Sequence, residues 1–101
     1  MKIALATDEP SLDREMAVRF GRGRFILFID SENRQIQVIP NPYLNFRGGV
    51  CKELAQWVAA EQAQLALAVY WAPQDQQILS SVGIQVQAVC DGSVRNILGP
   101  I

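Results

Sequence analysis

The stretch LALAVYWAPQDQQILSSVGIQVQAV, residues 65–89, contains two apolar runs on either side of a helical pattern. The first run, Leu65–Tyr70, is apolar throughout, which is typical of a strand that is buried on both faces. Pro73 suits the first turn of a helix, and Gly83 suits its C-terminal end. The second run, Ile84–Val89, predicts another strand. The stretch therefore predicts a strand, a helix and a strand in that order.

The N-terminal half of the sequence adds three strands to this pattern. Lys2–Thr7 (KIALAT) and Phe25–Ile29 (FILFI) are short apolar runs that predict buried strands. Ile36–Ile39 predicts a third strand, and the polar residues 30–34 before it suit a hairpin turn. Asp8–Met16 is polar and is expected to be a loop. Three strands thus come before the first predicted helix.

Two further helices complete the expected order of elements. Gly48 and Gly49 are expected to open an amphipathic helix, which ends near Glu61 and has apolar residues at helical spacing. A short final helix is expected over Val94–Leu98, with Ser93 as a candidate N-cap. The order strand-strand-strand-helix-strand-helix-strand-helix predicts an α/β fold with a mixed sheet. Residues 1–101 are expected to form one domain.

Composition narrows the class of function. The chain contains no histidine, which excludes a Ser–His or a Cys–His catalytic pair. Its two cysteines form neither a disulfide framework nor a zinc-binding pattern. No apolar stretch approaches the roughly 20 residues that span a bilayer, and the sequence shows no secretory signal. We therefore expect a cytoplasmic protein with no membrane partner.

Positive charge is concentrated in one third of the sequence. The whole chain has a net charge of −1, which argues against a nucleic-acid partner. Between Arg19 and Lys52, however, six basic residues stand against two acidic residues, a net charge of +4, and the rest of the chain carries −5. This local excess of positive charge predicts an anion-binding site.

The expected fold places the ends of several elements together. If the first, third, fourth and fifth strands are parallel, their C-terminal ends share one edge of the sheet, where ligands of open α/β sheets bind. The segments that open at this edge are Glu9–Gly23, Asn41–Gly49, Trp71–Gln74 and Cys90–Gly92. The N-terminus of the first helix lies there as well, and its free backbone N–H groups favour an anion.

Arginines and glycines near this edge are the candidate anion-binding residues. Guanidinium groups present forked donors that suit phosphate or an anionic, sulfide-rich cluster. Gly48 and Gly49 let the backbone approach a ligand closely, and Gly21 and Gly23 are expected to supply flexibility in the first loop. The candidate residues are Arg19, Gly21, Arg22 and Arg24 from the first loop, and Arg47, Gly48, Gly49 and Lys52 around the start of the first helix. The alternative is that the arginines are solvated surface charges or pair with Asp8, Glu9 and Asp13.

One thiol and two aromatic rings are further candidates. Cys51 is expected in the first turn of the helix, where a thiolate can act as a metal ligand of an iron–sulfur centre. Phe20 and Trp71 can wall the pocket, although Phe20 can equally be a core residue that anchors the loop. A lone cysteine is more often a small buried apolar residue, and this interpretation stays open for both Cys51 and Cys90.

Three stretches of the chain follow one another in the order of a known family. They are MKIALATD at residues 1–8, RFGRGRFILFID at residues 19–30 and APQDQQIL at residues 72–79. They resemble MKIAVASD, HFGRAPYFLIYD and GPNAFEAL, which are typical of the dinitrogenase iron–molybdenum cofactor biosynthesis family. The similarity extends over roughly residues 1 to 98, and Arg19 stands where the family usually has histidine.

The resemblance implies a ribonuclease-H-like fold, with a mixed five-stranded sheet in the order 3-2-1-4-5, an antiparallel second strand and flanking helices. It also implies a link to nitrogen fixation. Members of the family are accessory proteins that bind, carry or deliver metal–sulfur clusters, so a non-catalytic carrier of an iron–molybdenum or related cluster is expected. The partners that it implies are proteins that donate and accept the cluster, and a second copy of the chain is a further candidate partner.

Two other functions stay open at this point. One is a regulatory or protein-interaction domain of the same fold that has lost cluster binding, which is consistent with the missing histidine. The other is a nuclease, because ribonuclease-H folds cleave phosphodiesters with two metal ions held by carboxylates. Asp30 is expected at the opposite edge of the sheet, so only Asp8 and Asp91 would share a site, too few for two metal ions. The protein is therefore not expected to be an enzyme.

Overall fold

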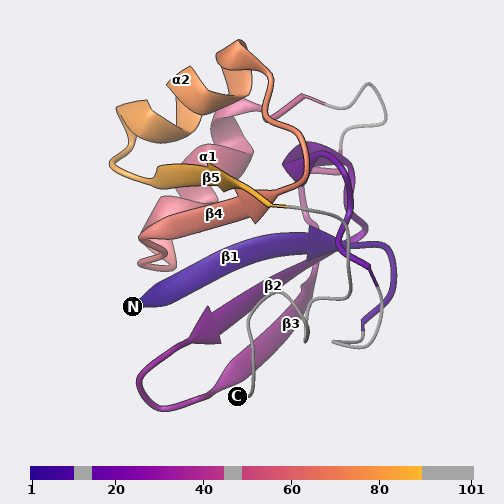
Figure 1. The fold of residues 1–101 in the computed structure, drawn as a ribbon, viewed down its shortest axis with the longest axis vertical. Coiled ribbons are helices and arrows are strands. Elements are labelled where there is room, and N and C mark those ends of the chain that lie inside the picture. Colours follow the sequence, from indigo (N-terminus) through magenta and orange to yellow (C-terminus); the bar gives the residue numbers. More distant parts are fainter. Residues whose placement is uncertain (11–14, 45–48, 90–101) are drawn as a thin grey trace.

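Within residues 1–10, 15–44 and 49–89, which the computed structural model describes, five strands form one sheet in the order β3-β2-β1-β4-β5 (Figure 1). The strands are β1 (Lys2–Thr7), β2 (Phe25–Asp30), β3 (Ile36–Pro40), β4 (Leu65–Ala68) and β5 (Gln85–Ala88). The helical elements are the short 3-10 helix η1 (Phe20–Arg22) and the helices α1 (Lys52–Ala60) and α2 (Pro73–Ser81). β1 is parallel to β4 and β4 to β5, whereas β2 is antiparallel to β1 and β3. The predicted sheet order and the antiparallel second strand are confirmed.

β1 lies at the centre of the sheet and is apolar on both faces. It pairs with β2 on one side and with β4 on the other, and its residues Ala4, Leu5 and Ala6 are buried. Ala4 and Ala6 lie in the core under the helices, and Leu5 lies in a core on the opposite face, so the side chains of β1 must suit two buried faces. This explains why the KIALAT run has no charged residue after Lys2.

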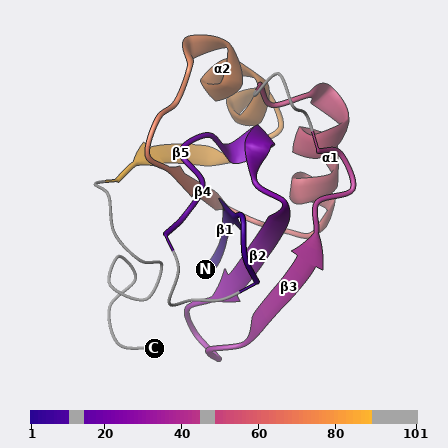
Figure 2. The same ribbon diagram turned by 90° about the vertical axis from the view of Figure 1, so that its right-hand side faces the viewer.

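Both helices pack on the same face of the sheet (Figure 2). The core on that face joins Leu54 and Val58 of α1 and Leu79 of α2 to the strands. The two central strands present small side chains there, and small side chains let a helix lie close to a sheet. These side chains are Ala4 and Ala6 of β1 and Ala66 and Ala68 of β4.

A second core lies on the opposite face of the sheet. It contains Leu5, Leu27, Ile29 and Leu67 from the strands, together with Met16 from the loop after β1. Successive side chains of a strand point to opposite faces, so the leucines of β1 and β4 alternate with their alanines. The sequences KIALAT and LALA thus encode two different faces, with small residues under the helices and large residues on the other side.

The loop between β1 and β2 lies across the C-terminal ends of β1 and β4. Thr7 and Met16 form an isolated antiparallel bridge, and the backbone N–H of Ala17 donates to the carbonyl oxygen of Ala6 (2.7 Å). The N–H of Tyr70, which follows β4, donates to the carbonyl oxygen of Val18 (3.0 Å). These bonds fix the residues before η1 at the edge of the sheet where the sequence predicts a ligand.

Two element boundaries differ from the predicted ones. α1 begins at Lys52 and not at the two glycines, because Cys51 has an extended backbone and acts as the N-cap. β4 ends at Ala68 and not at Tyr70, because the N–H of Tyr70 donates to the loop and not to a neighbouring strand. The predicted final helix, Val94–Leu98, lies outside the described residues. Within the described ranges, no helix has the length and apolar character needed to cross a membrane.

Candidate functional site

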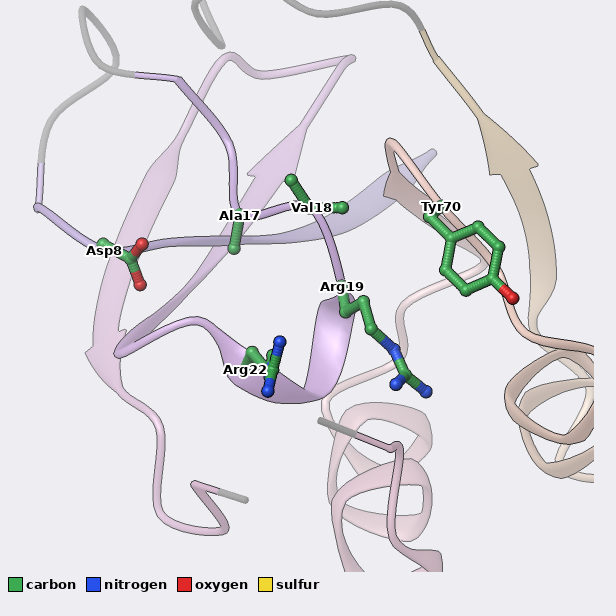
Figure 3. A pocket seen from close by; sticks show the side chains of 6 residues that line it. All are labelled: Asp8, Ala17, Val18, Arg19, Arg22 and Tyr70. Carbon is green, nitrogen blue, oxygen red and sulfur yellow. The ribbon is translucent and has the colours of Figure 1, made fainter. Parts of the chain in front are cut away.

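A pocket of about 390 Å³ opens at the C-terminal edge of the sheet (Figure 3). It is formed by the residue after β1, by the loop that leads into η1 and by the segment after β4. Its lining residues are Asp8, Ala17, Val18, Arg19, Arg22 and Tyr70. The structure thus brings together two of the predicted anion-binding residues, Arg19 and Arg22, with one carboxylate and one exposed aromatic ring.

Arg19 is held by an ion pair to a buried carboxylate. Its Nη2 donates to Oδ2 of Asp75 (2.9 Å), and Asp75 is 3% exposed. The other oxygen, Oδ1 of Asp75, accepts the backbone N–H of Val50 (3.0 Å). Removing a carboxylate from water is unfavourable unless it is both paired and hydrogen-bonded, and here it is both. Arg19 therefore pairs with an acid other than the three that the sequence offered nearby.

Asp75 reaches Arg19 because α2 starts at the same edge of the sheet. Pro73 begins α2, and Asp75 lies in its first turn, where a carboxylate interacts favourably with the helix N-terminus. The two partners are 56 residues apart in the sequence. The ion pair therefore joins the loop before η1 to the start of α2.

The guanidinium of Arg19 also contacts an aromatic ring. Its Cζ atom lies 5.9 Å from the centre of the Tyr70 ring, which is a cation–π contact. A guanidinium has five N–H donors, and Nη2 supplies the bond to Asp75. Nε of Arg19 is buried and has no hydrogen-bond partner within the described part of the chain. Arg19 is thus held in place between Asp75 and Tyr70 while it lines the pocket.

Two of the candidate glycines are required by close packing. A Cβ atom at Gly21 would overlap the carbonyl oxygen of Gly49, so Gly21 lets η1 lie against the segment before α1. A Cβ atom at Gly23 would overlap Cβ of Ala6 and lie 3.0 Å from the backbone nitrogen of Thr7. We predicted that these glycines supply flexibility for a ligand. The structure instead gives both of them a packing role beside the pocket.

The two candidate aromatic residues lie in the core. Phe20 and Trp71 stack with ring centres 5.8 Å apart and an angle of 25° between the rings, and they are 1% and 7% exposed. Nε1 of Trp71 donates to the carbonyl oxygen of Gln87 in β5 (2.9 Å). Neither ring is among the residues that line this pocket, and the burial of Phe20 agrees with the alternative that it is a core residue that anchors the loop. The exposed ring at the pocket is that of Tyr70.

The start of α1 lies beside the pocket and does not line it. Cys51 is half-buried, and its Sγ accepts the backbone N–H of Leu54 (3.4 Å), so the thiol serves as the cap of the helix. Lys52 is exposed. A Cβ atom at Gly49 would lie 3.6 Å from Oδ1 of Asp75, an ordinary contact, so Gly49 adjoins the buried ion pair. The role of Cys51 as a metal ligand stays a prediction.

The remaining candidates lie away from the pocket or outside the described residues. Arg24 is exposed, and its carbonyl oxygen accepts the backbone N–H of Asn41 (2.8 Å). Arg47, Gly48 and Cys90 lie outside the described ranges. Among the residues that are described, no group of three or more histidine, cysteine and acidic residues is placed to hold a metal ion.

Sequence reasoning missed two residues of this region, Tyr70 and Asp75. The rule that selected Trp71 also applies to Tyr70, because residues that follow a parallel strand lie at the C-terminal edge of the sheet, where ligands bind. Placing the end of β4 two residues too late hid it in the strand. An acidic residue at position 75 does not by itself indicate a functional site, since acidic residues are common in the first turn of a helix. Nothing in the sequence indicates that its carboxylate is buried.

Three solved structures share the fold of the chain. PH0822 has a TM-score of 0.79 at 19% identity, and the match covers 95% of this chain and 83% of that one. A Thermotoga protein, TM1290, described as a candidate NifB protein of the DUF35 family, has a TM-score of 0.78 at 18% identity, with 94% and 81% covered. The apo form of the orange protein from Desulfovibrio gigas has a TM-score of 0.79 at 27% identity, with 94% and 81% covered.

The sequence itself matches a family model along nearly its whole length. No curated protein sequence matches the chain. The family model described as dinitrogenase iron-molybdenum cofactor matches residues 1–100. This match includes β1, the loop with the two pocket arginines, and both helices of the described fold. The chain therefore belongs to the dinitrogenase iron–molybdenum cofactor family.

Proposed function

We propose that the protein is a non-catalytic carrier or assembly accessory protein that binds an anionic metal–sulfur cluster of the iron–molybdenum type. The observation that carries this proposal is the pocket at the C-terminal edge, where Arg19 and Arg22 lie together in a member of this family. Its volume of about 390 Å³ falls within the range of small-ligand sites. The cluster is the cargo of the protein, which takes it from one partner protein and gives it to another.

The lining of the pocket suits the outer surface of such a cluster. Guanidinium groups donate hydrogen bonds to anions, and Arg19 and Arg22 both line the pocket. Ala17, Val18 and the Tyr70 ring add apolar surface, which suits weakly hydrated sulfide. A cluster held by these side chains would be bound through its charge and its surface and not through a complete set of metal ligands. Such a contact is reversible, which a carrier needs.

The orange protein gives this proposal further support. Its structure is described as that of the apo form, a term for a protein without its bound group. The match covers 94% of this chain at 27% identity. We extend from it the proposal that this chain likewise alternates between an empty and a loaded form.

A second candidate function is a regulatory or protein-interaction domain that does not hold a cluster. The observation that favours it is the ion pair between Arg19 and Asp75, because the carboxylate compensates one of the two pocket cations. A nuclease is disfavoured by the position of the acids. Asp30 is paired with Lys2 at the start of β1, whereas Asp8 follows the end of β1, so the two carboxylates lie at opposite edges.

Anaerobic reconstitution with iron, sulfide and molybdate tests the proposed function. After desalting, visible absorbance and metal analysis report what the protein retains. We expect the parent protein to retain coloured metal–sulfur material, and Arg22→Gln to retain several-fold less, because one of the two pocket guanidiniums is lost. The matched control is Arg34→Gln, an exposed arginine in the turn between β2 and β3.

Three outcomes can be told apart. Retention by the parent and by Arg34→Gln, with a loss in Arg22→Gln, supports the carrier. Equal retention by all three proteins contradicts binding at this pocket. No retention by the parent under any of these conditions favours the regulatory or interaction domain.

A further inference from the structure

We propose that Asp75 lowers the affinity of the pocket for its anion. Its carboxylate competes with the anion for the guanidinium of Arg19, so that the cargo can be released. This inference rests on the proposed carrier function, and it concerns a residue that does not itself line the pocket. Asp75 contacts Arg19 through Oδ2 (2.9 Å), and Arg19 does line the pocket. A ligand bound to Arg19 therefore shares that guanidinium with a fixed protein carboxylate.

The carboxylate is a permanent part of the site and not a mobile competitor. Asp75 is 3% exposed and lies in the first turn of α2. Its Oδ1 accepts the N–H of Val50 (3.0 Å), which ties α2 to the segment before α1. Gly21 of η1 packs directly on Gly49, the residue before Val50. The three segments that meet at this edge therefore hold the negative charge in a fixed place.

The charges around the pocket are nearly balanced as a result. Its lining contains two cations, Arg19 and Arg22, and one anion, Asp8. Among the described residues that line the pocket or form a salt bridge with its lining, the carboxylates of Asp8 and Asp75 thus stand beside the guanidiniums of Arg19 and Arg22. A site with this balance attracts an anion through directed hydrogen bonds from the guanidiniums, with little long-range attraction.

Two effects of the carboxylate oppose one another, and their sizes decide the direction. Asp75 holds Arg19 in place, and fixing one side chain in advance improves affinity by roughly twofold to tenfold. Asp75 also repels an anion across the guanidinium. At a separation of about 7 Å this repulsion weakens affinity by about threefold per charge in water and by about fiftyfold at an effective dielectric constant of about 20. For a dianion the repulsion is about ninefold in water, comparable to the largest gain from holding Arg19 in place, and it is far larger at the lower dielectric constant of about 20.

The test compares Asp75→Asn with the parent in anaerobic equilibrium dialysis against tetrathiomolybdate, a molybdenum–sulfur dianion. Asparagine has nearly the shape of aspartate, and its Oδ1 can still accept the N–H of Val50. We expect the variant to bind tetrathiomolybdate roughly fivefold more tightly at low salt, with a smaller difference at high salt because salt screens the repulsion. A loss of packing alone would weaken binding and would not depend on salt in this way.

The test also needs a control variant at another carboxylate and a second variant that neutralises Asp75. Glu53→Gln removes an exposed carboxylate from the first turn of α1, and we expect it to change the affinity less than twofold. If Asp75→Asn fails to fold, Asp75→Ser removes the same charge with a shorter polar side chain, with the same expected direction. Circular dichroism identifies which variants are folded.

The outcomes separate this inference from the carrier proposal. If the parent binds tetrathiomolybdate and both neutral variants bind it equally or more weakly, the proposed role of Asp75 is wrong and the proposed carrier function still stands. Binding by the neutral variants with none by the parent supports the role of Asp75 and overturns the carrier. No binding by the parent or by either folded neutral variant overturns both.

Discussion

The C-terminal edge of the sheet and the opposite edge each carry a pocket, and they differ in how they place charge. At the C-terminal edge, Arg19 pairs at 2.9 Å with Asp75, whose side chain is 4% exposed. At the opposite edge, the pairs are longer and more exposed: Lys2 lies 3.9 Å from Glu61, and the N-terminal amino group lies 3.7 Å from Glu32. The pocket at that edge has a volume of about 210 Å³.

The buried pair at the C-terminal edge and the more exposed pairs at the opposite edge should therefore differ in how much they matter for stability. Exposed ion pairs contribute little to stability, because water and salt screen them and because long side chains lose freedom on pairing. A buried carboxylate must keep its partner, since a buried charge without one is strongly unfavourable. The opposite edge can therefore lose a charge with little effect, whereas the C-terminal edge depends on Arg19 and Asp75 together.

The largest loss of stability is expected when one partner of the buried ion pair between Arg19 and Asp75 is removed. Arg19→Gln leaves the carboxylate of Asp75 buried without its cation, and we expect the free energy of unfolding to fall by about 3 kcal/mol. Urea denaturation followed by circular dichroism measures it. The double variant Arg19→Gln/Asp75→Asn should recover much of the loss, because no uncompensated charge remains.

Lys2→Gln is the matched control at the opposite edge. It breaks the partly exposed pair with Glu61 and the contact of the Lys2 ammonium with the Phe28 ring, and we still expect a loss of no more than about 1 kcal/mol. Equal losses for Arg19→Gln and Lys2→Gln would contradict the difference between the two edges.

An intermediate effect is expected from crowding the contact beneath the pocket. Gly21→Ala places a Cβ atom against the carbonyl oxygen of Gly49, a backbone atom that cannot turn aside, and we expect a loss of about 2 kcal/mol in the free energy of unfolding. Gly83→Ala is the comparison. Gly83 has a φ of +85° with open space around its Cβ position, so only backbone strain of about 1 kcal/mol is expected there. A smaller loss for Gly21→Ala than for Gly83→Ala would show that η1 does not need this contact.

The smallest effect concerns pH and belongs to the opposite edge. The backbone N–H of Glu32, which donates to Asp30 (2.9 Å), lowers the pKa of that carboxyl below 3.8. A lowered pKa in the folded state means that Asp30 adds stability above its unfolded pKa and that this contribution is lost as the pH falls through the folded pKa. We expect Asp30→Asn to be slightly less stable than the parent at pH 6, with the difference shrinking as the pH falls below 3.8 and disappearing once the pH is below the folded pKa. Urea denaturation across this pH range would contradict the expectation if the difference grew in acid.

The strands could be predicted from the sequence because their signal is local. KIALAT, FILFI and LALA are short apolar runs, and the alternation of alanine with leucine already contains the two faces of the sheet. The start of α1 could not be placed, because a glycine pair suggests a helix start while the actual N-cap is Cys51, an uncommon residue there. The end of β4 depends on a hydrogen bond from Tyr70 to Val18, which joins distant segments.

The candidate site was predictable in its position and not in its contacts. The rule that ligands lie at the C-terminal ends of parallel strands selected Arg19 and Arg22, and both line the pocket. Burial in the core could not be predicted for Trp71, since its stacking partner Phe20 lies 51 positions earlier in the sequence. The pairing of Arg19 with Asp75 also spans distant segments, and neither residue type indicates it.

The most direct test of where the cargo binds is an anaerobic NMR titration of the ¹⁵N-labelled protein with tetrathiomolybdate. We expect the amide signals that move to be those around the pocket at the C-terminal edge, above all the signals of Ala17, Val18, Arg22 and Tyr70. The amides of Gln37 and Gln62, at the pocket of the opposite edge, should stay unchanged. Equal shifts at both edges, or no shifts at saturating tetrathiomolybdate, would contradict the claim that this pocket holds a metal–sulfur anion.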